Sequence, residues 1–391
     1  MLRLLVRGFL ILPALCTLGC GAARDAGPQR AQDLPTRPPT PARFEKFDRH
    51  VPGLLDQYLV AGVGIGVIEN RRLAWSGFYG EQEPGKAAGP TTVWNTASVA
   101  KTLTAEVLLA LASEGLISLD EPIAPHVDHP DLGNDPRYGL LTPRLLLAHR
   151  SGLRNWPYEY EGGRARFIAT PGNAFSYSGM GIELAAQFAE NKLEQDFEAL
   201  ARAHVLGPLG ITAAELSLGR LRPELRGRLA RPMDRDGVYL SLDESGGRLA
   251  GARDNGPWSG ADDLLTTVDA YARFMVGAME NRWVDAERAA ERNTLETSLA
   301  DNEMWGCPEE GQVQCAERFG HSVGWMLYEW PDHTILKHGG NDAGENALAL
   351  YSPESGSGVV IFVNGGNGIF VSTQILGLLG AYPDLTAYYR R

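Results

Sequence analysis

Segments with strand patterns lie at both ends of this chain, and an Ala- and Leu-rich region with helical patterns separates them. Near the N-terminus, residues 63–68 and 73–75 flank the polar stretch 69–72, which predicts a hairpin. Toward the C-terminus, strand patterns occur at 323–328, 334–337, 347–351 and 359–363. Strands at both ends favour one sheet built from both, with a helical lobe inserted between them. The predicted fold class is α/β (α+β), with a mainly antiparallel sheet flanked by helices.

The start of the chain has the pattern of an export signal. Two arginines precede an apolar run at 8–18 that is too short to span a bilayer. The run ends at Cys20 in a sequence that resembles a bacterial lipobox, with Thr17 where Leu is usual. We therefore expect a lipoprotein-type signal peptide at 1–20 and lipid attachment at Cys20. The body of the protein would then face the periplasm or the cell surface, and plain cleavage near residues 21–23 is the alternative.

The remaining chain divides by composition. Prolines among polar residues make 21–42 an extended tether. Residues 43–385 are expected to form one folded domain. Its sheet lobe comes from about 43–97 and 318–385, and its helical lobe from about 98–317.

Charge and cysteine content narrow the class of protein. The chain has 391 residues and a formal net charge of −12, which gives no electrostatic footprint for nucleic acid. Cys307 and Cys315 are the cysteines left once the signal is removed and Cys20 is lipidated. Because export compartments oxidise thiols, we expect these two residues to form a disulfide.

A serine and a lysine lie one helical turn apart at the start of a predicted helix. In Ser98-Val99-Ala100-Lys101 the i, i+3 spacing puts both side chains on one helical face. A serine hydroxyl needs a base beside it to act as a nucleophile, and a desolvated lysine can be neutral near pH 7. The chain has only five lysines, so a chance match is less frequent than in a chain of ordinary lysine content. Taken alone, the pattern also fits a surface helix with Ser98 as its N-cap.

Two further motifs carry polar groups suited to catalysis. Tyr177-Ser178-Gly179 offers a phenol that can relay protons, although a lone tyrosine is more often a packed aromatic. His338-Gly339-Gly340 follows the strand predicted at 334–337. Its glycines would let a substrate lie against the strand edge.

In this order, the three motifs resemble the class C β-lactamase-related serine hydrolases, which include penicillin-binding proteins, D-alanyl-D-alanine peptidases and esterases. Stretches similar to the family also occur at 145–153, 319–325 and 364–366, and the resemblance covers about 44–380. It implies the family's fold, with a site in the groove between the two lobes and no cofactor or metal. It also implies roles for individual residues: Ser98, Lys101 and Tyr177 would be catalytic, and Gly179, His338, Gly339, Gly340 and Asn341 would bind substrate.

The chain departs from the family at two of these positions. Gly179 stands where the family usually has Asn, so a side-chain amide that binds substrate is missing and β-lactam turnover is in doubt. His338 stands where true class C β-lactamases have Lys. Lys337 is the other candidate for that position, but the family's glycine six residues on matches Gly344 only if His338 is the motif residue.

Three rival interpretations compete with this one. Gly320-His321-Ser322-Val323-Gly324 matches a nucleophile elbow, but that motif needs a helix after the turn, and here a strand pattern follows. His126, Asp128, His129 and Asp131 offer metal-ligand chemistry in a proline-broken loop, where a polar surface is the simpler reading. A lipoprotein that binds cell-wall peptide without hydrolysing it is the third.

The expected function is therefore that of an exported serine hydrolase acting through an acyl-enzyme on an ester or a D-amino-acid amide or peptide. The alternatives are a β-lactamase or D-alanyl-D-alanine carboxypeptidase, and the non-catalytic binding lipoprotein. The oxyanion would be held by backbone N–H groups of Ser98 and, by resemblance, Asn341.

Overall fold

The computed structural model describes residues 40–241, 258–299 and 314–388. By its internal contacts the chain divides into two units, residues 1–42 and 43–391. The signal peptide, Cys20 and nearly all of the tether lie outside the described residues, as does Cys307. In the part that is described, no helix has the length and apolar character needed to cross a membrane.

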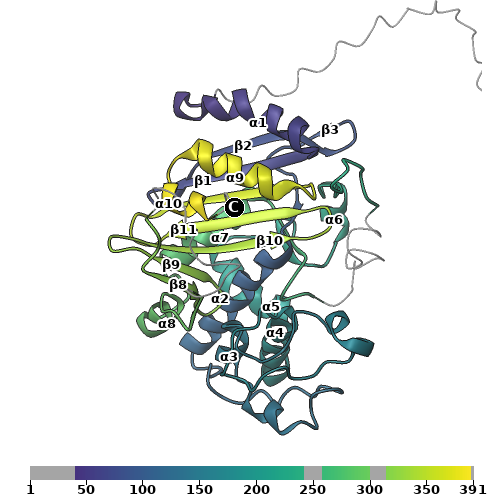
Figure 1. The fold of residues 1–391 in the computed structure, drawn as a ribbon, viewed down its shortest axis with the longest axis vertical. Coiled ribbons are helices and arrows are strands. Elements are labelled where there is room, and N and C mark those ends of the chain that lie inside the picture. Colours follow the sequence, from purple (N-terminus) through teal and green to yellow (C-terminus); the bar gives the residue numbers. More distant parts are fainter. Residues whose placement is uncertain (1–39, 242–257, 300–313, 389–391) are drawn as a thin grey trace, which may run out of the picture. The chain divides into compact units, whose positions relative to one another are not determined.

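The second unit is built around one large antiparallel sheet (Figure 1). In the described residues, nine strands follow the order β3-β2-β1-β12-β11-β10-β9-β8-β7. They are β1 (Gly62–Glu69), β2 (Arg72–Glu83), β3 (Lys86–Ala87), β7 (Thr297–Ser298), β8 (Arg318–His321), β9 (Met326–Glu329), β10 (Thr334–Asn341), β11 (Asn346–Ser352) and β12 (Ser357–Val363). A second, three-stranded sheet contains β4 (Trp94–Asn95), β6 (Leu264–Thr266) and β5 (Leu216–Leu218).

The large sheet joins the two ends of the unit. β1 pairs with β12, from Val63 opposite Val363 to Ile68 opposite Gly358. β1 and β2 form the predicted hairpin, and its turn residues Asn70 and Arg71 both have positive φ, as a tight hairpin turn requires. The predicted fold class, with a mainly antiparallel sheet flanked by helices, is confirmed.

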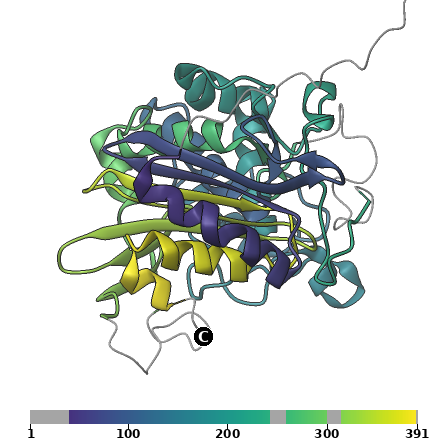
Figure 2. The same ribbon diagram turned by 90° about the horizontal axis from the view of Figure 1, so that it is seen from above.

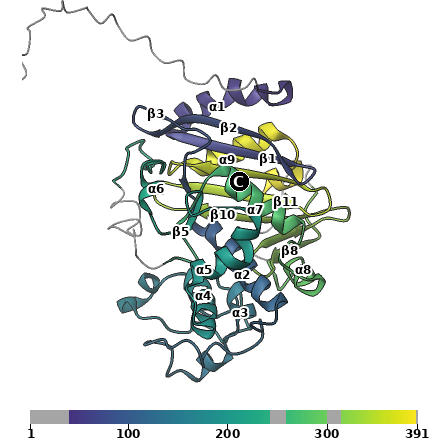
Figure 3. The ribbon, with the colours of Figure 1, turned by 180° about the vertical axis from the view of Figure 1, so that it is seen from behind.

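Helices cover both faces of the sheet. Alternate residues of β12 enter two cores: Val359 and Ile361 pack in one, and Val360 and Phe362 in the other. On the first face, α1 and α9 lie side by side (Figure 2). On the opposite face, α7 packs on β1, β2 and β12 (Figure 3). The α-helices are α1 (Glu45–Tyr58), α2 (Ala100–Ser113), α3 (Pro143–Leu147), α4 (Gly179–Leu193), α5 (Phe197–Ala201), α6 (Pro223–Arg226), α7 (Val268–Met279), α8 (Ala286–Arg292), α9 (Gly368–Leu379) and α10 (Pro383–Ala387).

Shorter helical turns connect these elements. They are η1 (Ala42–Phe44), η2 (Ala97–Val99), η3 (Pro136–Leu140), η4 (Pro157–Glu159), η5 (Glu161–Gly163), η6 (Arg202–Leu206) and η7 (Gly207–Leu209).

Two local expectations are corrected. The strand expected at 323–328 is the second half of a hairpin: β8 and β9 pair, and Ser322–Trp325 forms the turn between them. Gly324 in that turn has φ of 82°, which excludes a regular strand there. β10 runs on to Asn341, so His338 lies within the strand rather than at its end.

Candidate active site

Ser98 lies in a tight turn between a short strand and a long helix. β4 ends at Asn95, η2 contains Ser98, and α2 begins at Ala100. Ala97, directly before Ser98, has φ of 46°, an uncommon value for a residue with a side chain. The Asn95 side-chain oxygen holds this conformation by accepting the Ala97 N–H at 3.1 Å. Such local strain is typical of functional sites, and it leaves Ser98 half-buried in an otherwise buried segment.

Lys101 is buried directly beneath Ser98. Its side chain lies within the core, and its Nζ donates to Ser98 Oγ at 2.9 Å and to the Ala261 carbonyl at 2.6 Å. The same Nζ lies 5.0 Å from the centroid of the Tyr177 ring. The structure therefore brings Ser98, Lys101 and Tyr177 together, from the start of α2 and from the segment before α4.

Glu183 on α4 holds the loop that accepts the second bond from Lys101. Its carboxylate accepts from Ser259 Oγ at 2.8 Å and from the N–H groups of Gly260 and Ala261 at 3.1 and 3.2 Å. Sequence reasoning did not identify this residue. The available signal was that Glu183 is the single charged residue in the apolar stretch 180–189.

Three histidines surround Tyr177. Its ring lies 4.3 Å from that of His149 and 6.4 Å from those of His321 and His338, measured between centroids. Burial lowers the pKa of His321 to about 3, and it also lowers the pKa values of His149 and His338 well below their usual range, with a smaller contribution from the charge on Lys101. The imidazoles are therefore neutral at pH 7.

The His338 motif forms an open strand edge beside Ser98. In the described residues β9 pairs only with Thr334–Lys337 of β10, so β9 does not pair with the edge from His338 to Asn341. A Cβ at Gly340 would lie 2.1 Å from the Thr96 carbonyl oxygen, so only glycine lets β10 come this close to the Ser98 turn.

His338, rather than Lys337, faces the Ser98 side of the sheet. His338 Nδ1 donates to the Gly339 carbonyl at 2.7 Å, which makes Nε2 the acceptor nitrogen. That buried Nε2 has no hydrogen-bond partner among the described residues. Lys337 points to the other face of the sheet, where its Nζ lies 5.7 Å from the Tyr328 ring centroid.

These residues line one pocket of about 380 Å³, a volume typical of small-molecule sites. Lys101 and Gly179 do not line it: Lys101 lies beneath Ser98, and Gly179 behind Asn155 and Trp156. The lining residues are Ser98, Asn155, Tyr177, His321, Met326, Lys337, His338, Gly339, Gly340, Asn341, Asn346, Ala347, Leu348 and Ile369.

Gly179 is required by its neighbours. A Cβ at this position would lie 2.5 Å from Cζ2 of Trp156, so the family's Asn would fit here only if that ring moved. Asn155 lines the pocket at the same place, and its Oδ1 accepts the Gly179 N–H at 2.7 Å. This bond leaves the Nδ2 group of Asn155 as a donor, so a side-chain amide is present although it comes from another residue.

The rival serine is not placed to react. Ser322 is fully buried, and its hydroxyl donates to the Trp325 carbonyl at 3.2 Å. The Gly-x-Ser-x-Gly stretch forms a strand–turn–strand hairpin, without the helix that a nucleophile elbow needs.

The candidate metal ligands do not converge. His126 contacts the ring of Phe188, His129 Nδ1 accepts the Asp131 N–H, and Asp131 accepts the Ala165 N–H. Among the described residues, no group of three or more His, Cys, Asp or Glu side chains is arranged to hold a metal ion.

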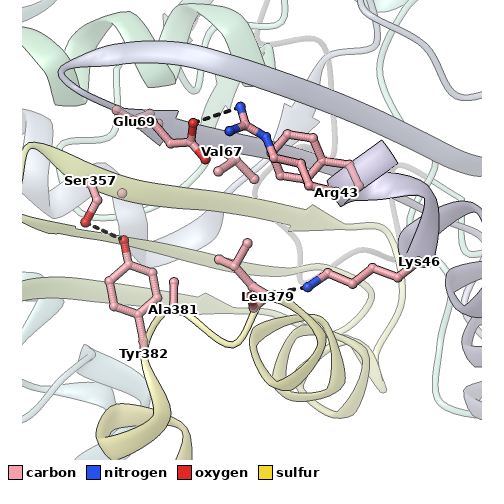
Figure 4. A pocket seen from close by; sticks show the side chains of 11 residues that line it. Arg43, Lys46, Val67, Glu69, Ser357, Leu379, Ala381 and Tyr382 are labelled. Atoms are coloured by element: carbon pink, nitrogen blue, oxygen red, sulfur yellow. Dashed lines mark hydrogen bonds and ion pairs between the residues drawn. The ribbon is translucent and has the colours of Figure 1, made fainter. Parts of the chain in front are cut away.

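A second pocket, of about 190 Å³, lies beside the start of α1 and the end of α9 (Figure 4). Its polar groups pair with one another: Arg43 with Glu69 at 2.9 Å, and the Tyr382 hydroxyl with Ser357 Oγ at 3.1 Å. Its lining contains no nucleophile with an adjacent base, so we assign it no catalytic role.

Cys315 is disulfide-bonded. Its expected partner, Cys307, is outside the described residues, so the pairing of the two stays a prediction. The same holds for lipid attachment at Cys20.

Comparisons with known proteins agree with this fold. The chain is 26% identical over 167 residues to Protein flp of Staphylococcus aureus (strain MW2), a match that covers 38% of this chain and only about a third, 34%, of that protein. Its structure is similar to D-alanine carboxypeptidase AmpC from Burkholderia cenocepacia (TM-score 0.65, 20% identity, 86% of this chain and 98% of that one). It is also similar to D-amino acid amidase from Ochrobactrum anthropi SV3 (TM-score 0.64, 18% identity, 86% and 99%).

These structures share the mixed fold with a large antiparallel sheet, and at such identities the likeness concerns the fold alone. The family model described as Beta-lactamase matches residues 47–375, which include the Ser98 turn, the Tyr177 segment and β10. Because that match spans most of the chain, this protein belongs to the Beta-lactamase family.

Proposed function

We propose that this protein is a serine hydrolase that works through an acyl-enzyme on Ser98. The observation that carries the proposal is the 2.9 Å contact between Lys101 Nζ and Ser98 Oγ at the floor of the 380 Å³ pocket. A serine becomes nucleophilic when a base lies within hydrogen-bond distance, and Lys101 meets this condition from the same helical face.

The chemical steps follow from the groups around Ser98. The amine of Lys101 accepts the Ser98 proton as Oγ attacks the substrate carbonyl carbon, and the carbonyl oxygen becomes an oxyanion. Backbone N–H groups of Ser98 and Asn341 stabilise that oxyanion, and each such donor is typically worth about a hundredfold or more in rate. The leaving group takes a proton through Tyr177, whose ring lies over Lys101 Nζ. Water then hydrolyses the acyl-enzyme by the same proton path in reverse.

The substrate class we propose is an ester or a D-amino-acid amide or peptide. Two proteins with similar structures are named as a D-alanine carboxypeptidase and a D-amino acid amidase, which supports this class. β-Lactam turnover is the weaker candidate, because His338 is neutral where class C β-lactamases carry a lysine, and because Gly179 has no side-chain amide. Asn155 supplies a side-chain amide from another backbone position, so that amide would approach the substrate from a different direction than the Asn of the family.

The test is a panel of a chromogenic ester, a D-alanyl peptide and a chromogenic cephalosporin, with the wild type and Ser98→Ala. We expect ester or peptide hydrolysis that is lost in Ser98→Ala, and a cephalosporin efficiency well below ~10⁶ M⁻¹s⁻¹, a value typical of good enzymes. Cephalosporin turnover at or above that value would make the protein a β-lactamase. Binding of D-alanyl peptide without turnover of any substrate would favour the non-catalytic lipoprotein.

We further propose that the protein is exported and anchored through lipid on Cys20. The supporting evidence is the apolar run that ends at Gly19-Cys20, followed by the proline-rich tether. Mass spectrometry of the mature N-terminus tests this: a diacylglyceryl mass on Cys20 is expected, and an unmodified start at Arg24 would show plain secretion instead.

A further inference from the structure

The pocket beside Ser98 extends across the open edge of β10 to the other face of the sheet. Lys337 of β10 pairs with Met326 of β9, and Gly339 of β10 pairs with Leu348 of β11, so these residues are neighbours on three adjacent strands. All four line the pocket. A Cβ at Gly339 would have only the Ala347 carbonyl oxygen within 4 Å, at 3.8 Å, among the described residues. The space above Gly339 is therefore open.

This branch of the pocket is apolar in character. Its walls are Met326, Leu348 and Ile369, and its remaining side chain is the buried amine of Lys337. Burial lowers the pKa of that amine to about 7, so about half of the molecules carry a charge on Lys337 at pH 7, and the amine already lies against the Met326 sulfur and the Tyr328 ring. Because Lys337 is already buried against these side chains, an apolar group can enter the branch without removing the water shell of an exposed ion.

Ile369, one wall of the branch, is also one of a group of exposed apolar side chains, which we call the apolar rim: Leu59, Val238, Ile369 and Phe370. They are four of the eight large apolar side chains that are exposed in the described residues. Ile369, 40% exposed, belongs to both the pocket and the rim. Clustered exposed apolar residues beside a pocket mark a binding surface, whereas scattered ones need no explanation.

Contacts between three segments hold the rim together. Phe370 stacks on Tyr58 with ring centroids 5.5 Å apart, and Leu59 is the next residue along the chain. The turn that contains Val238 packs on Leu59, since a Cβ at Gly237 would lie 3.3 Å from the Leu59 Cβ. The side-chain amide of Asn367 donates to the carbonyls of Tyr58 and Arg235, at 2.9 Å each.

The branch lies on the leaving-group side of the scissile bond. Tyr177, the proposed proton donor to the leaving group, has His321 and His338 as ring neighbours. His321 pairs with Met326 in the β8–β9 hairpin, and His338 precedes Gly339. An atom protonated through Tyr177 is therefore next to the entrance of the branch.

We propose that this branch and the apolar rim bind the leaving group of the substrate, and that the substrate is an ester or amide of an apolar alcohol or amine long enough to pass Ile369. This inference rests on the proposed function of Ser98 and adds the chemical class of the leaving group. The hydrolysis itself balances with water alone: the acyl group leaves as an acid, and the apolar group as its alcohol or amine.

Two ester series test the proposal on the purified protein. One is a series of alkyl acetates from ethyl to octyl, and the other a series of ethyl esters from acetate to octanoate. We expect kcat/KM to rise two- to fourfold for each added methylene in the alcohol series until the branch and the rim are filled, since that is the range expected for burying a methylene. The acyl series should change much less.

Variants localise the effect. Ile369→Ser and Phe370→Ser should each lower the octyl-to-ethyl acetate ratio of kcat/KM by about fivefold or more. The control is Leu140→Ser, because Leu140 is 50% exposed, close to the 53% of Phe370, and lies on η3 outside the pocket. Its ratio should match that of the wild type.

Labelling of Ser98 by a fluorophosphonate separates this inference from the proposed function. If the wild type is labelled and hydrolyses ethyl acetate, but its alcohol series is flat or only its acyl series rises, the leaving-group assignment is wrong while the hydrolase stands. An unchanged ratio in both Ile369→Ser and Phe370→Ser would also overturn it. If Ser98 is neither labelled nor acylated by any ester, the proposed function itself fails.

Discussion

At the scale of single residues, the site depends on a few hydrogen-bonded polar groups inside an apolar core. Lys101 is fully buried, and its amine has two oxygen acceptors, Ser98 Oγ and the Ala261 carbonyl. Buried amines without such partners are costly, and the pair fixes Nζ on the nucleophile. The distance to Ser98 is therefore set by packing and by the turn at Ala97, rather than by the helix alone.

Lys101→Met tests the base directly. Methionine keeps the length and apolar character of the stem but has no group to accept the proton. We expect kcat/KM for a chromogenic ester to fall by about a hundredfold to ten-thousandfold, the usual contribution of a general base. The urea unfolding midpoint serves as the control for folding. An ester rate within threefold of the wild type would show that another group is the base.

Gly179→Asn tests whether Trp156 has taken the place of the family's amide. The new Cβ would lie 2.5 Å from the Trp156 ring, so the ring must move, and overpacking of this kind usually costs about 1–3 kcal/mol. The free energy of unfolding should fall by that amount. In the double variant with Trp156→Ala, the loss should be smaller than the sum of the two single losses, because the clash is gone. Additive losses would contradict this account.

At the scale of secondary-structure elements, the strand ladder was easier to predict than the loops. β1, β2, β11 and β12 follow from alternating or continuous apolar runs bounded by turn residues. The β8–β9 turn was missed because it depends on a contact between distant parts of the chain. The indole of Trp325, a residue in an apolar stretch of sequence, donates to the buried carboxylate of Glu106 at 2.9 Å. Asn155 was missed for a similar reason, since only the fold brings its loop onto Gly179.

Glu183 shows how one helix positions a catalytic group on another, and Glu183→Gln tests this role. Glutamine keeps one acceptor oxygen but loses the charge and the second acceptor, so the Ser259–Ala261 loop should be held less firmly. We expect kcat and the rate of fluorophosphonate labelling to fall about tenfold while KM changes little. The matched control is Glu194→Gln, at the far end of the same helix. A fall in unfolding midpoint without any change in labelling would make Glu183 merely structural.

At the scale of the whole molecule, the buried histidines make the free energy of unfolding depend on pH. His149, His321 and His338 have pKa values lowered by burial, so each binds a proton in the unfolded chain below pH 6.5 but not in the folded one. Burial raises the pKa of Glu345, so this carboxyl keeps a proton in the folded state at pH values where it is ionised in the unfolded chain, and it opposes the histidines. The histidines outnumber this one carboxyl, so the unfolded state binds more protons than the folded state, and stability falls as the pH falls.

The free energy of unfolding should therefore drop by roughly 1–3 kcal/mol per pH unit as the pH is lowered from 6.5 toward 5. Urea unfolding at several pH values measures this slope. His321→Asn should reduce it by the equivalent of one proton, because an amide does not titrate. A stability that is constant over this interval would mean that the histidines are protonated in the folded protein.

The central claim is that Ser98 carries the acyl group, and site mapping with a fluorophosphonate probe tests it most directly. Mass spectrometry of the peptides from the labelled wild type should place the adduct on Ser98. Ser322→Ala should label at the wild-type rate, and Ser98→Ala should not label although its unfolding midpoint is unchanged. Labelling that survives in Ser98→Ala and disappears in Ser322→Ala would contradict the account.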